Sequence, residues 1–489
     1  MEVAATWARA DSDVGEIPIF VGGNWEASDD PFTVHEAGGG PPVTHTYRAS
    51  EEQYERAVEA AVEAFKTTRR MASFEKSEIL RSIATGMSEQ RESLGRLLAV
   101  EAGKPIGDAL TEIDRTALAF RISAEEAERI GGEVLPLDLI PTARGRWGIT
   151  RHMPLGPVAA ITPFNVPLSL AAHKLGPALA AGNSIVLKPP SQVPGTLLRL
   201  AEIIERAGAI PGSVSILPMS RDLGNRMVED PRFRLLTFTG SSSVGWDMRA
   251  RAGTKKVALE LGGNAGLIVD ETSDPAYAAT RTARGAFKHA GQLCISVQRV
   301  YVHRSNWNEY LDVLVDEAAA LKVGHPLDES VDLGPMVSIP AADQFIQWLA
   351  EAESLGGKIL EGGEREGAFV RPTVVIDVPS EAKLCAEEAF APVVVVTPFD
   401  AFEEAIDAVN DSNYGLQAGV FTSDFERAWT AFEDLDVGGV VINDIPTFRV
   451  DNMPYGGNKS SGEGREGIKY ALEHMTELRL MVVAPDGHA

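Results

Sequence analysis

The stretch PVAAITPFNVPLSLAAHKLGPALAAGNSIVLK, residues 157–188, sets the pattern from which the fold can be predicted. A short apolar run at 158–161 precedes a helical stretch at 167–181, which has proline at its start and glycine just past its end. A second apolar run follows at 184–187. Strand, helix and strand in this order predict a βαβ unit of a parallel, doubly wound α/β sheet.

The same alternation extends along the chain. Toward the C-terminus it predicts helices at 196–207 and 242–252, and strands at 213–217 and 234–237. A second α/β series follows the glycine pair at 262–263, with a strand at 267–269, a helix at 275–290 and a strand at 298–303. Upstream, Ser50 and Gln53 form a capping box that opens a helical region reaching about residue 129. The terminal apolar run at 478–483 predicts a strand that pairs with another part of the fold or with a partner subunit.

Composition limits the functional class. The 489 residues exceed one core and suggest roughly three structural units. With 45 basic and 70 acidic residues the net charge is −25, which would repel nucleic acid. No apolar run approaches the ~18 residues of a membrane helix, and the N-terminus lacks a signal-peptide pattern. Two cysteines suit a reducing compartment. We therefore expect a cytoplasmic enzyme without a nucleic-acid or membrane partner.

Four segments combine polar residues with tight glycine or proline punctuation. They are Thr162-Pro-Phe-Asn-Val-Pro-Leu168, Phe238-Thr-Gly-Ser-Ser-Ser-Val-Gly245, Leu259-Glu-Leu-Gly-Gly-Asn264 and Gly291-Gln-Leu-Cys294. Cys294 would be a nucleophile if its thiol were exposed and activated, or else a buried core cysteine. Cys385 stands in a charged run without such punctuation, so we expect no catalytic role for it.

Glu260 is the candidate base. It lies in an apolar, strand-like run just before a Gly-Gly turn. A carboxylate in an apolar setting has a raised pKa, which suits proton transfer. The alternative is a structural carboxylate that accepts hydrogen bonds from backbone N–H groups of the turn.

The segment at 240–245 lies between a predicted strand and a predicted helix, where backbone N–H groups could hold a phosphate. It matches neither the usual dinucleotide fingerprint nor the P-loop, and serine and glycine also make ordinary helix caps. By itself the segment is a weak signal.

Together these segments resemble those of the aldehyde dehydrogenase superfamily. Two more motifs complete the resemblance, Glu387-Glu-Ala-Phe-Ala-Pro392 and Pro454-Tyr-Gly-Gly-Asn-Lys-Ser-Ser-Gly462. The six occur in the family's order over nearly the whole chain, and Glu260 and Cys294 are spaced as in the hydrolytic members. The motif style is closest to the lactaldehyde, succinate-semialdehyde and glyceraldehyde branch.

The resemblance implies the reaction and the residues that carry it. Cys294 would attack the aldehyde carbonyl, Asn165 and the Cys294 backbone N–H would hold the oxyanion, and Glu260 would activate the water that hydrolyses the thioester. Hydride would pass to NAD or NADP. The implied cofactor-binding residues are Phe164, Lys188, Ser191, Gly240, Ser241, Glu388 and Phe390. Lys174 matches a lysine near the active site whose role stays open. No metal is expected.

Two departures from the family pattern concern the cofactor. Ala391 replaces glycine in the motif around Glu388. Ser191 stands where NAD-preferring members carry glutamate, which would repel a 2′-phosphate, and Lys188 supplies a positive charge nearby. We expect NADP to be accepted and slightly favoured, with NAD as the alternative.

Substrate choice is predicted from residues that match the family's tunnel. Arg115 and Arg449 would converge there and favour a small polar aldehyde that bears an acid or a hydroxyl group. Val166, Leu293 and Tyr455 are the other predicted substrate-binding residues, and the apolar character of the first two argues against this. Alternatively, Arg115 pairs with Glu112 or Asp114 and Arg449 pairs with Asp451, which leaves a tunnel for neutral aliphatic or aromatic aldehydes.

The resemblance also implies a domain plan. A cofactor-binding domain would take residues 1–130 and 150–260, a catalytic domain 261–460, and a small β element for dimer or tetramer formation 131–149 and 476–489. Rival hypotheses are a cysteine hydrolase, an acyl-CoA-forming enzyme, to which Glu260 is unsuited, and a non-catalytic nucleotide-binding protein on the same scaffold.

Overall fold

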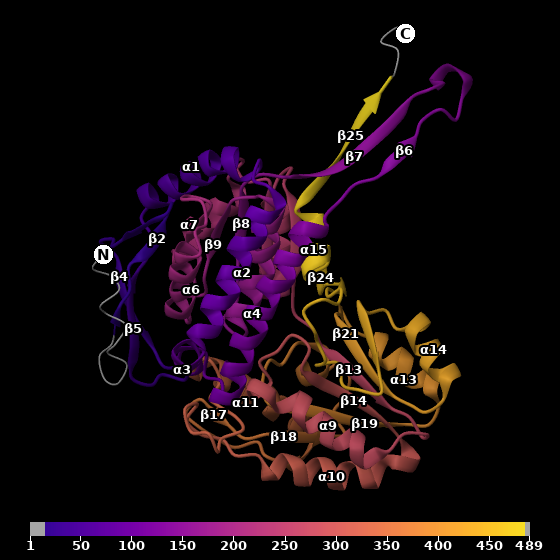
Figure 1. Cartoon of the computed structure of the whole chain (residues 1–489). Coiled ribbons are helices and arrows are strands. Elements are labelled where there is room, and N and C mark those ends of the chain that lie inside the picture. Colours follow the sequence, from indigo (N-terminus) through magenta and orange to yellow (C-terminus); the bar gives the residue numbers. More distant parts are fainter. Residues whose placement is uncertain (1–14, 485–489) are drawn as a thin grey trace.

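The computed structural model describes residues 15–484. The chain forms two lobes, each built around a sheet, and a narrow β arm that projects from the first lobe (Figure 1). Helices and sheets alternate along most of the sequence.

The sheet of the first lobe has five parallel strands at its centre and short antiparallel strands at both edges. In spatial order the strands are β24 (Gly462–Glu463), β12 (Lys256–Glu260), β11 (Leu235–Thr239), β8 (Val158–Ile161), β9 (Ile185–Lys188), β10 (Val214–Ile216), β2 (Ile19–Val21) and β3 (Asn24–Glu26). The doubly wound order predicted from 157–188 is present, and β8 occupies the predicted residues.

Alternate residues of these strands face two different apolar cores. Val158 and Ala160 join one core, whereas Ala159 and Ile161 join the other. This alternation is what a sheet covered on both faces requires. One face is covered by α2 (Ser73–Glu89), α3 (Arg91–Ala102), α4 (Ile106–Arg129), α5 (Pro167–Ala181), α6 (Pro194–Arg206) and α15 (Ile468–His474). The other is covered by α1 (Glu51–Thr68), α7 (Arg221–Glu229) and α8 (Ser242–Arg251).

The second lobe repeats the plan with a sheet in which only the edge strand β15 is antiparallel. In spatial order its strands are β15 (Lys358–Glu361), β18 (Thr373–Ile376), β19 (Val393–Phe399), β14 (Val297–His303), β13 (Ala265–Val269), β21 (Gln417–Phe421) and β22 (Gly439–Ile442). Its helices are α9 (Pro275–Phe287), α10 (Trp307–Ala320), α11 (Ile339–Ser354), α12 (Lys383–Ala386), α13 (Phe402–Asn410) and α14 (Phe425–Asp434).

The arm is an antiparallel sheet of β6 (Val134–Pro136), β7 (Trp147–Pro154) and β25 (Thr476–Val483). The C-terminal strand therefore pairs with β7 of its own chain, in a register that joins Thr476 to Pro154 and Val483 to Trp147. Leu478, Leu480 and Val482 remain at least half exposed. The arm leaves an apolar face uncovered.

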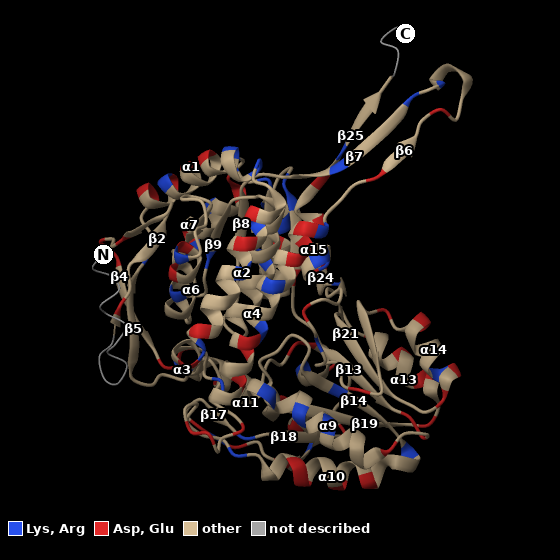
Figure 2. Cartoon of the chain, viewed as in Figure 1, with Lys and Arg blue, Asp and Glu red and all other residues tan. Residues whose placement is uncertain are grey.

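Short elements complete the fold. They are the strands β1 (Gly15–Glu16), β4 (Pro31–His35), β5 (Pro42–Tyr47), β16 (Arg365–Glu366), β17 (Phe369–Val370), β20 (Tyr414–Gly415) and β23 (Asn458–Lys459), and the 3₁₀ turns η2 (Pro141–Ala143), η3 (Lys288–Gly291) and η4 (Arg304–Asn306). Acidic and basic residues are interspersed along the ribbon of both lobes (Figure 2). Within residues 15–484, no helix has the length and apolar character needed to cross a membrane.

Candidate active site

One cavity of about 140 Å³ gathers residues from distant parts of the chain. Its walls come from α4, from the start of α5, and from the loops that follow α9 and β22. Every predicted catalytic or substrate-binding residue except Glu260 lines it, namely Arg115, Asn165, Val166, Leu293, Cys294, Arg449 and Tyr455. Residues chosen from separate motifs thus meet in one place.

The loop that presents Cys294 begins earlier than the sequence predicted. The helix α9 ends at Phe287, and the next residues, His289 and Ala290, have positive φ angles of 51° and 53°. Gly291 follows with φ 69°, and a Cβ there would come within 1.9 Å of the Ala391 carbonyl oxygen. Residues other than glycine rarely adopt positive φ angles, and here two of them precede a glycine that also has one. This tight turn is therefore a strained segment of the kind found at functional sites.

Cys294 lies half-buried at the end of this turn. Its Sγ is 2.8 Å from the Tyr455 hydroxyl. Burial raises the pKa of the thiol to about 11, while the Tyr455 hydrogen bond and the Arg449 charge oppose that shift. Cys385 is also half-buried, and its Sγ lies 4.0 Å from the Val378 carbonyl oxygen, away from the cavity.

Glu260 ends β12 and is only 3% exposed. Neither of its carboxylate oxygens has a hydrogen-bond partner among residues 15–484. The alternative of a carboxylate satisfied by the following Gly-Gly turn is therefore wrong. Burial, followed by the charge of Glu466, raises the pKa of Glu260 well above its usual range, against the opposing charges of Arg449 and Lys174. This is an unusual environment for a purely structural carboxylate, because buried acids are normally paired.

Asn165 lies between β8 and α5 and is buried. Its Nδ2 donates to the Gln292 carbonyl at 2.9 Å, which joins it to the loop of Cys294. An amide nitrogen carries two N–H groups, so a second donor remains. In the described part of the chain, its Oδ1 atom has no hydrogen-bond partner. The side chain is thus fixed beside Cys294 with hydrogen-bonding capacity to spare.

The two arginines are ion-paired, but not to the acids considered from the sequence. Arg115 binds Asp451, with its Nη2 2.7 Å from Oδ1, and Arg449 binds Glu466 at 3.0 Å. Both pairs join the cavity to the segment after β22, which local spacing could not reveal. Glu112 and Asp114 are instead bonded to Lys104 and Arg91, respectively.

Glu466 is the main residue that sequence reasoning missed. It is buried and accepts from Lys174 Nζ at 3.1 Å as well as from Arg449. These two cations overcome the effect of burial and lower its pKa. Lys174, whose role the sequence left open, therefore forms an ion pair with Glu466. A glutamate in a glycine-rich C-terminal segment gives no local signal for such a position.

Several of the residues assigned to the dinucleotide lie at the ends of strands in the first lobe. Lys188 ends β9, burial lowers its pKa, and it pairs with no acidic side chain in the described part of the chain. Ser241 precedes α8 without a side-chain capping bond. Beside it the buried Thr239 hydroxyl has no partner, and a Cβ at Gly240 would come within 2.4 Å of the Phe238 ring. Unsatisfied polar groups beside a close-fitting glycine suit a phosphate-bearing ligand.

Glu388 and two aromatic rings lie between the lobes. Glu388 accepts from the Gly263 N–H at 3.1 Å, and burial raises its pKa to about 7. The rings of Phe164 and Phe390 meet edge to face with their centroids 6.0 Å apart. Phe390 has a positive φ of 48° although Ala391 follows it in place of glycine. Ser191 is exposed in the loop after β9.

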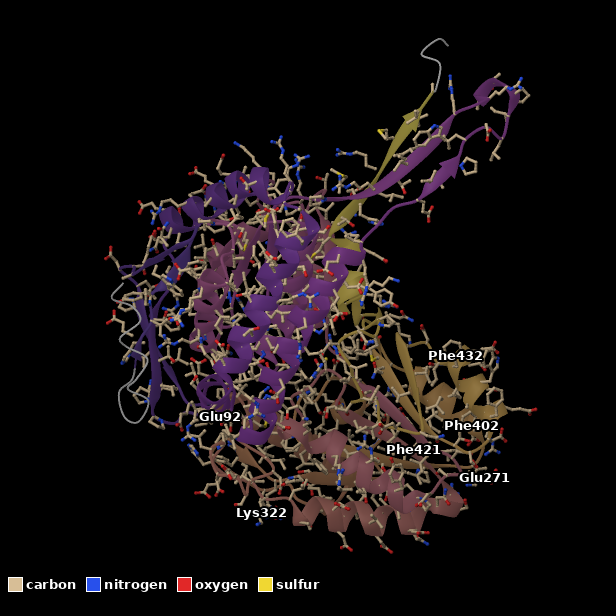
Figure 3. All side chains as sticks on the ribbon, viewed as in Figure 1. Glu92, Glu271, Lys322, Phe402, Phe421 and Phe432 are labelled. Carbon is tan, nitrogen blue, oxygen red and sulfur yellow. The ribbon has the colours of Figure 1, made fainter. Side chains whose placement is uncertain are left out.

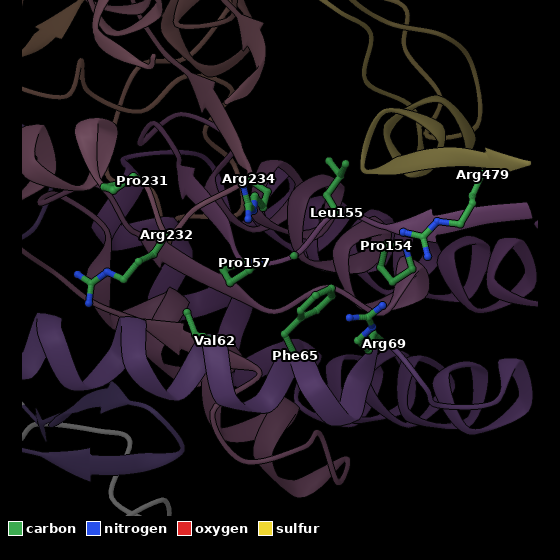
Figure 4. A pocket seen from close by; sticks show the side chains of 11 residues that line it. Val62, Phe65, Arg69, Pro154, Leu155, Pro157, Pro231, Arg232, Arg234 and Arg479 are labelled. Atoms are coloured by element: carbon green, nitrogen blue, oxygen red, sulfur yellow. The ribbon is translucent and has the colours of Figure 1, made fainter. Parts of the chain in front are cut away.

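A larger hollow of about 560 Å³ lies at the base of the arm (Figure 4). Four of its lining residues are arginines: Arg69, Arg232, Arg234 and Arg479. Apolar side chains such as Phe65 and Leu155 form the rest of the wall. Its lining contains none of the predicted site residues and neither cysteine, whereas the smaller cavity contains most of them.

Comparison with known proteins agrees with this geometry. The model of the Aldehyde dehydrogenase family matches residues 25–481. The 3-sulfolactaldehyde dehydrogenase of Priestia aryabhattai is 42% identical over 96% of this chain and 99% of its own. The crystal structure of aldehyde dehydrogenase 21 from Physcomitrella patens, in complex with the product succinate, superimposes with a TM-score of 0.95 at 42% identity, covering 98% of this chain and 100% of that one.

A third relative carries a cofactor. The glyceraldehyde-3-phosphate dehydrogenase GapN of Methanocaldococcus jannaschii, complexed with NADP, has a TM-score of 0.89 at 37% identity over 94% of this chain and 99% of its own. The predicted resemblance and the predicted α/β fold are therefore confirmed. The chain belongs to the aldehyde dehydrogenase family and is an oxidoreductase that acts on aldehydes.

Proposed function

We propose that this enzyme oxidises a small, acid-bearing hydroxy-aldehyde to the carboxylic acid through a thioester on Cys294. The observation that carries the proposal is the cavity itself, which holds a thiol, a side-chain amide and two arginines. A thiol is the nucleophile that such chemistry needs, and the partly exposed Arg115 can bind an anionic group at the far end of the substrate.

The chain's own residues perform three tasks. The Cys294 thiolate adds to the aldehyde carbon, and the carbonyl electron pair moves to oxygen. The free N–H of Asn165 donates to that oxygen. A nicotinamide dinucleotide, when bound, supplies the hydride acceptor. Glu260 then takes a proton from the water that attacks the thioester carbon, after which the C–S bond breaks and the electron pair returns to sulfur.

The cofactor is a nicotinamide dinucleotide held by Lys188, Ser241 and Glu388. We favour NADP because Ser191 adds no negative charge beside Lys188, and because the M. jannaschii relative was crystallised with NADP. The ratio of kcat/KM for NADP to that for NAD tests this preference. Ser191→Glu should lower the ratio sharply, and a strong NAD preference in the wild type would contradict it.

The acidic substrate class is supported by the relatives as well as by the arginines. One is named for 3-sulfolactaldehyde, one was crystallised with succinate and one is named for glyceraldehyde 3-phosphate. Each of these three compounds carries an acid group. A panel of sulfolactaldehyde, lactaldehyde, succinate semialdehyde, propanal, hexanal and benzaldehyde tests the class. Faster turnover of hexanal or benzaldehyde than of any acidic aldehyde would favour the neutral-substrate alternative, and no turnover at all would favour a binding protein.

Two exposed apolar surfaces support a homo-oligomer. The arm exposes Leu478 and Leu480, and α14 exposes an aromatic row of Phe425, Trp429 and Phe432 beside the edge strand β22. Figure 3 labels Phe432 in the second lobe with Phe402 and Phe421, both of which are buried. The arm of one subunit would cover the aromatic row on α14 of another subunit. Leu478→Glu with Leu480→Glu should yield monomers by mass photometry, and an unchanged mass would refute the contact.

The proposal includes the domain plan that the family resemblance implies. Residues 1–130 and 150–260 would bind the cofactor, 261–460 would supply the nucleophile, and 131–149 with 476–489 would join subunits. Two free cysteines and no disulfide among the described residues suit a cytoplasmic enzyme.

A further inference from the structure

The hydroxyl group of Tyr455 forms a hydrogen bond with Cys294, the proposed nucleophile. Tyr455 is 4% exposed and packs with Ile295 and Leu416 in a small apolar cluster beside Cys294. Its hydroxyl lies 2.8 Å from Cys294 Sγ, and in residues 15–484 no other side chain makes a hydrogen bond to that sulfur. The packing holds the ring, and thereby the hydroxyl, at the thiol.

Arg449 lies over the face of the same ring. Its guanidinium carbon is 3.8 Å from the ring centroid of Tyr455. Glu466 holds the guanidinium, and the Tyr455 backbone N–H donates to the Glu466 carbonyl at 3.0 Å. Glu466 is therefore bonded both to Arg449 and to the backbone of Tyr455. A cation over an aromatic face draws electron density from the ring, which makes the phenol a better hydrogen-bond donor.

The direction of the hydrogen bond follows from the chemistry of its two atoms. Either atom can donate while sulfur carries a proton, but a thiolate can only accept. Burial raises the pKa of the Tyr455 hydroxyl well above its usual range, so it keeps its proton at neutral pH. Once Cys294 ionises, the bond is therefore O–H to S⁻.

We propose that Tyr455 is a catalytic residue that donates a hydrogen bond to the Cys294 thiolate, and that Arg449 positions it. The proposal rests on the nucleophilic role given to Cys294 above. The hydrogen bond stabilises the thiolate before attack and again when the C–S bond of the thioester breaks and its electron pair returns to sulfur. Tyr455 keeps its proton throughout. Since the bond is made to sulfur, it acts on every aldehyde alike.

Alkylation of Cys294 by iodoacetamide, followed by peptide mass spectrometry across pH, tests the proposal without aldehyde or cofactor. Tyr455→Phe keeps the ring and removes only the hydroxyl. Loss of a hydrogen bond to a charged group should move the alkylation midpoint upward by about one to two pH units. The kcat/KM should fall by about 10- to 100-fold for acidic and neutral aldehydes equally.

The matched control is Tyr310→Phe. Tyr310 is also fully buried, and its hydroxyl donates to Thr282 at 2.8 Å in the core of the second lobe. This change should leave the alkylation midpoint in place. Arg449→Met, which removes the charge but keeps the phenol, should move the midpoint in the same direction by less.

An unchanged midpoint in Tyr455→Phe, with a melting temperature near that of the wild type, would overturn the proposal. If Tyr455→Phe does not fold, an unchanged midpoint in Arg449→Met would overturn the positioning by the cation. Failure of the proposed function has a different signature, because Cys294→Ala would then retain aldehyde oxidation whatever the alkylation profile shows.

Discussion

Glu101 and Glu260 are both buried glutamates of the first lobe, but their surroundings are opposite. Glu101 is 0% exposed and its carboxylate accepts four hydrogen bonds, from Thr44 Oγ1, the Gly195 N–H, and the N–H and Oγ1 of Thr196. Glu260 accepts none. Burial raises the pKa of both, but only Glu101 has hydrogen bonds that oppose the shift.

The difference supports the role as a base that we propose for Glu260. The carboxylate of Glu101 joins the end of α3 to the start of α6 and to β5, so its hydrogen bonds stabilise the fold. Desolvation of the Glu260 carboxylate is opposed only by nearby charges such as those of Arg449 and Lys174, and by no hydrogen bond among the described residues. Natural proteins keep such unsatisfied groups where chemistry needs them. Burial alone is therefore no sign of function, whereas a buried carboxylate with neither oxygen hydrogen-bonded calls for an explanation.

The largest expected effect is on the unsatisfied carboxylate. Glu260→Gln should lower steady-state turnover by about 10²- to 10⁴-fold, since a general base is lost, while a first-turnover burst of reduced cofactor remains. Its melting temperature should not fall, because no hydrogen bond is removed. Rapid-quench kinetics and calorimetry measure both results. Cys294→Ala, the control, should abolish the burst as well, and normal turnover in Glu260→Gln would end its role as base.

How far the sequence could predict these features depends on the range of the interactions. The capping box of Ser50 and Gln53 is local, and the structure contains both of its hydrogen bonds. The strand–helix alternation is local too, and α5 spans its predicted residues. The partners of Arg115 and Arg449 are not local, since Asp451 follows Arg115 by hundreds of residues. The pairs considered from neighbouring residues were wrong for that reason.

Candidate site residues differ in the same way. The family resemblance brought Cys294, Asn165 and Tyr455 to attention, and the three line one cavity. Glu466 was missed because its importance lies in ion pairs with Lys174 and Arg449 that only the folded chain makes. No periodicity or motif marks an acid whose partners come from α5 and from a distant loop.

The comparison extends from carboxylates to amides. Asn183 is buried with both ends satisfied, accepting from the Gly156 N–H at 2.9 Å and donating to the Met475 carbonyl at 2.9 Å, whereas Asn165 Oδ1 has no partner. Asn165→Ala should lower kcat by about 10²- to 10³-fold, the usual effect of losing one oxyanion donor. Asn183→Ala should instead reduce thermal stability. A kcat within a few-fold of wild type in Asn165→Ala would remove it from the oxyanion site.

A smaller effect is expected at the arginine that faces the substrate. Arg115 is one-third exposed and bonded to buried Asp451, so part of its guanidinium remains free. Arg115→Ala should raise KM for an acidic aldehyde about tenfold or more and leave that for propanal nearly unchanged. Arg91→Ala is the matched control, since Arg91 pairs with Asp114 outside the cavity. Equal losses for both substrates in Arg115→Ala would indicate a structural arginine.

The smallest effect on catalysis, and the counterpart of the first prediction, concerns Glu101. In Glu101→Gln an amide N–H₂ replaces one carboxylate oxygen and faces donors that need an acceptor. We expect a loss of about 1–3 kcal/mol in the free energy of unfolding, with kcat unchanged in the folded fraction.

Because burial raises the native pKa of Glu101, the native state binds its proton more tightly than the unfolded chain does. This carboxyl therefore makes wild-type stability fall as pH rises from the ordinary glutamate range through that raised pKa, and glutamine removes its share of the slope. Denaturant titrations of both proteins at several pH values measure the difference. An unchanged unfolding free energy in Glu101→Gln would mean that hydrogen bonds do not distinguish the two acids, and the contrast with Glu260 would then have to come from the neighbouring charge of Glu466.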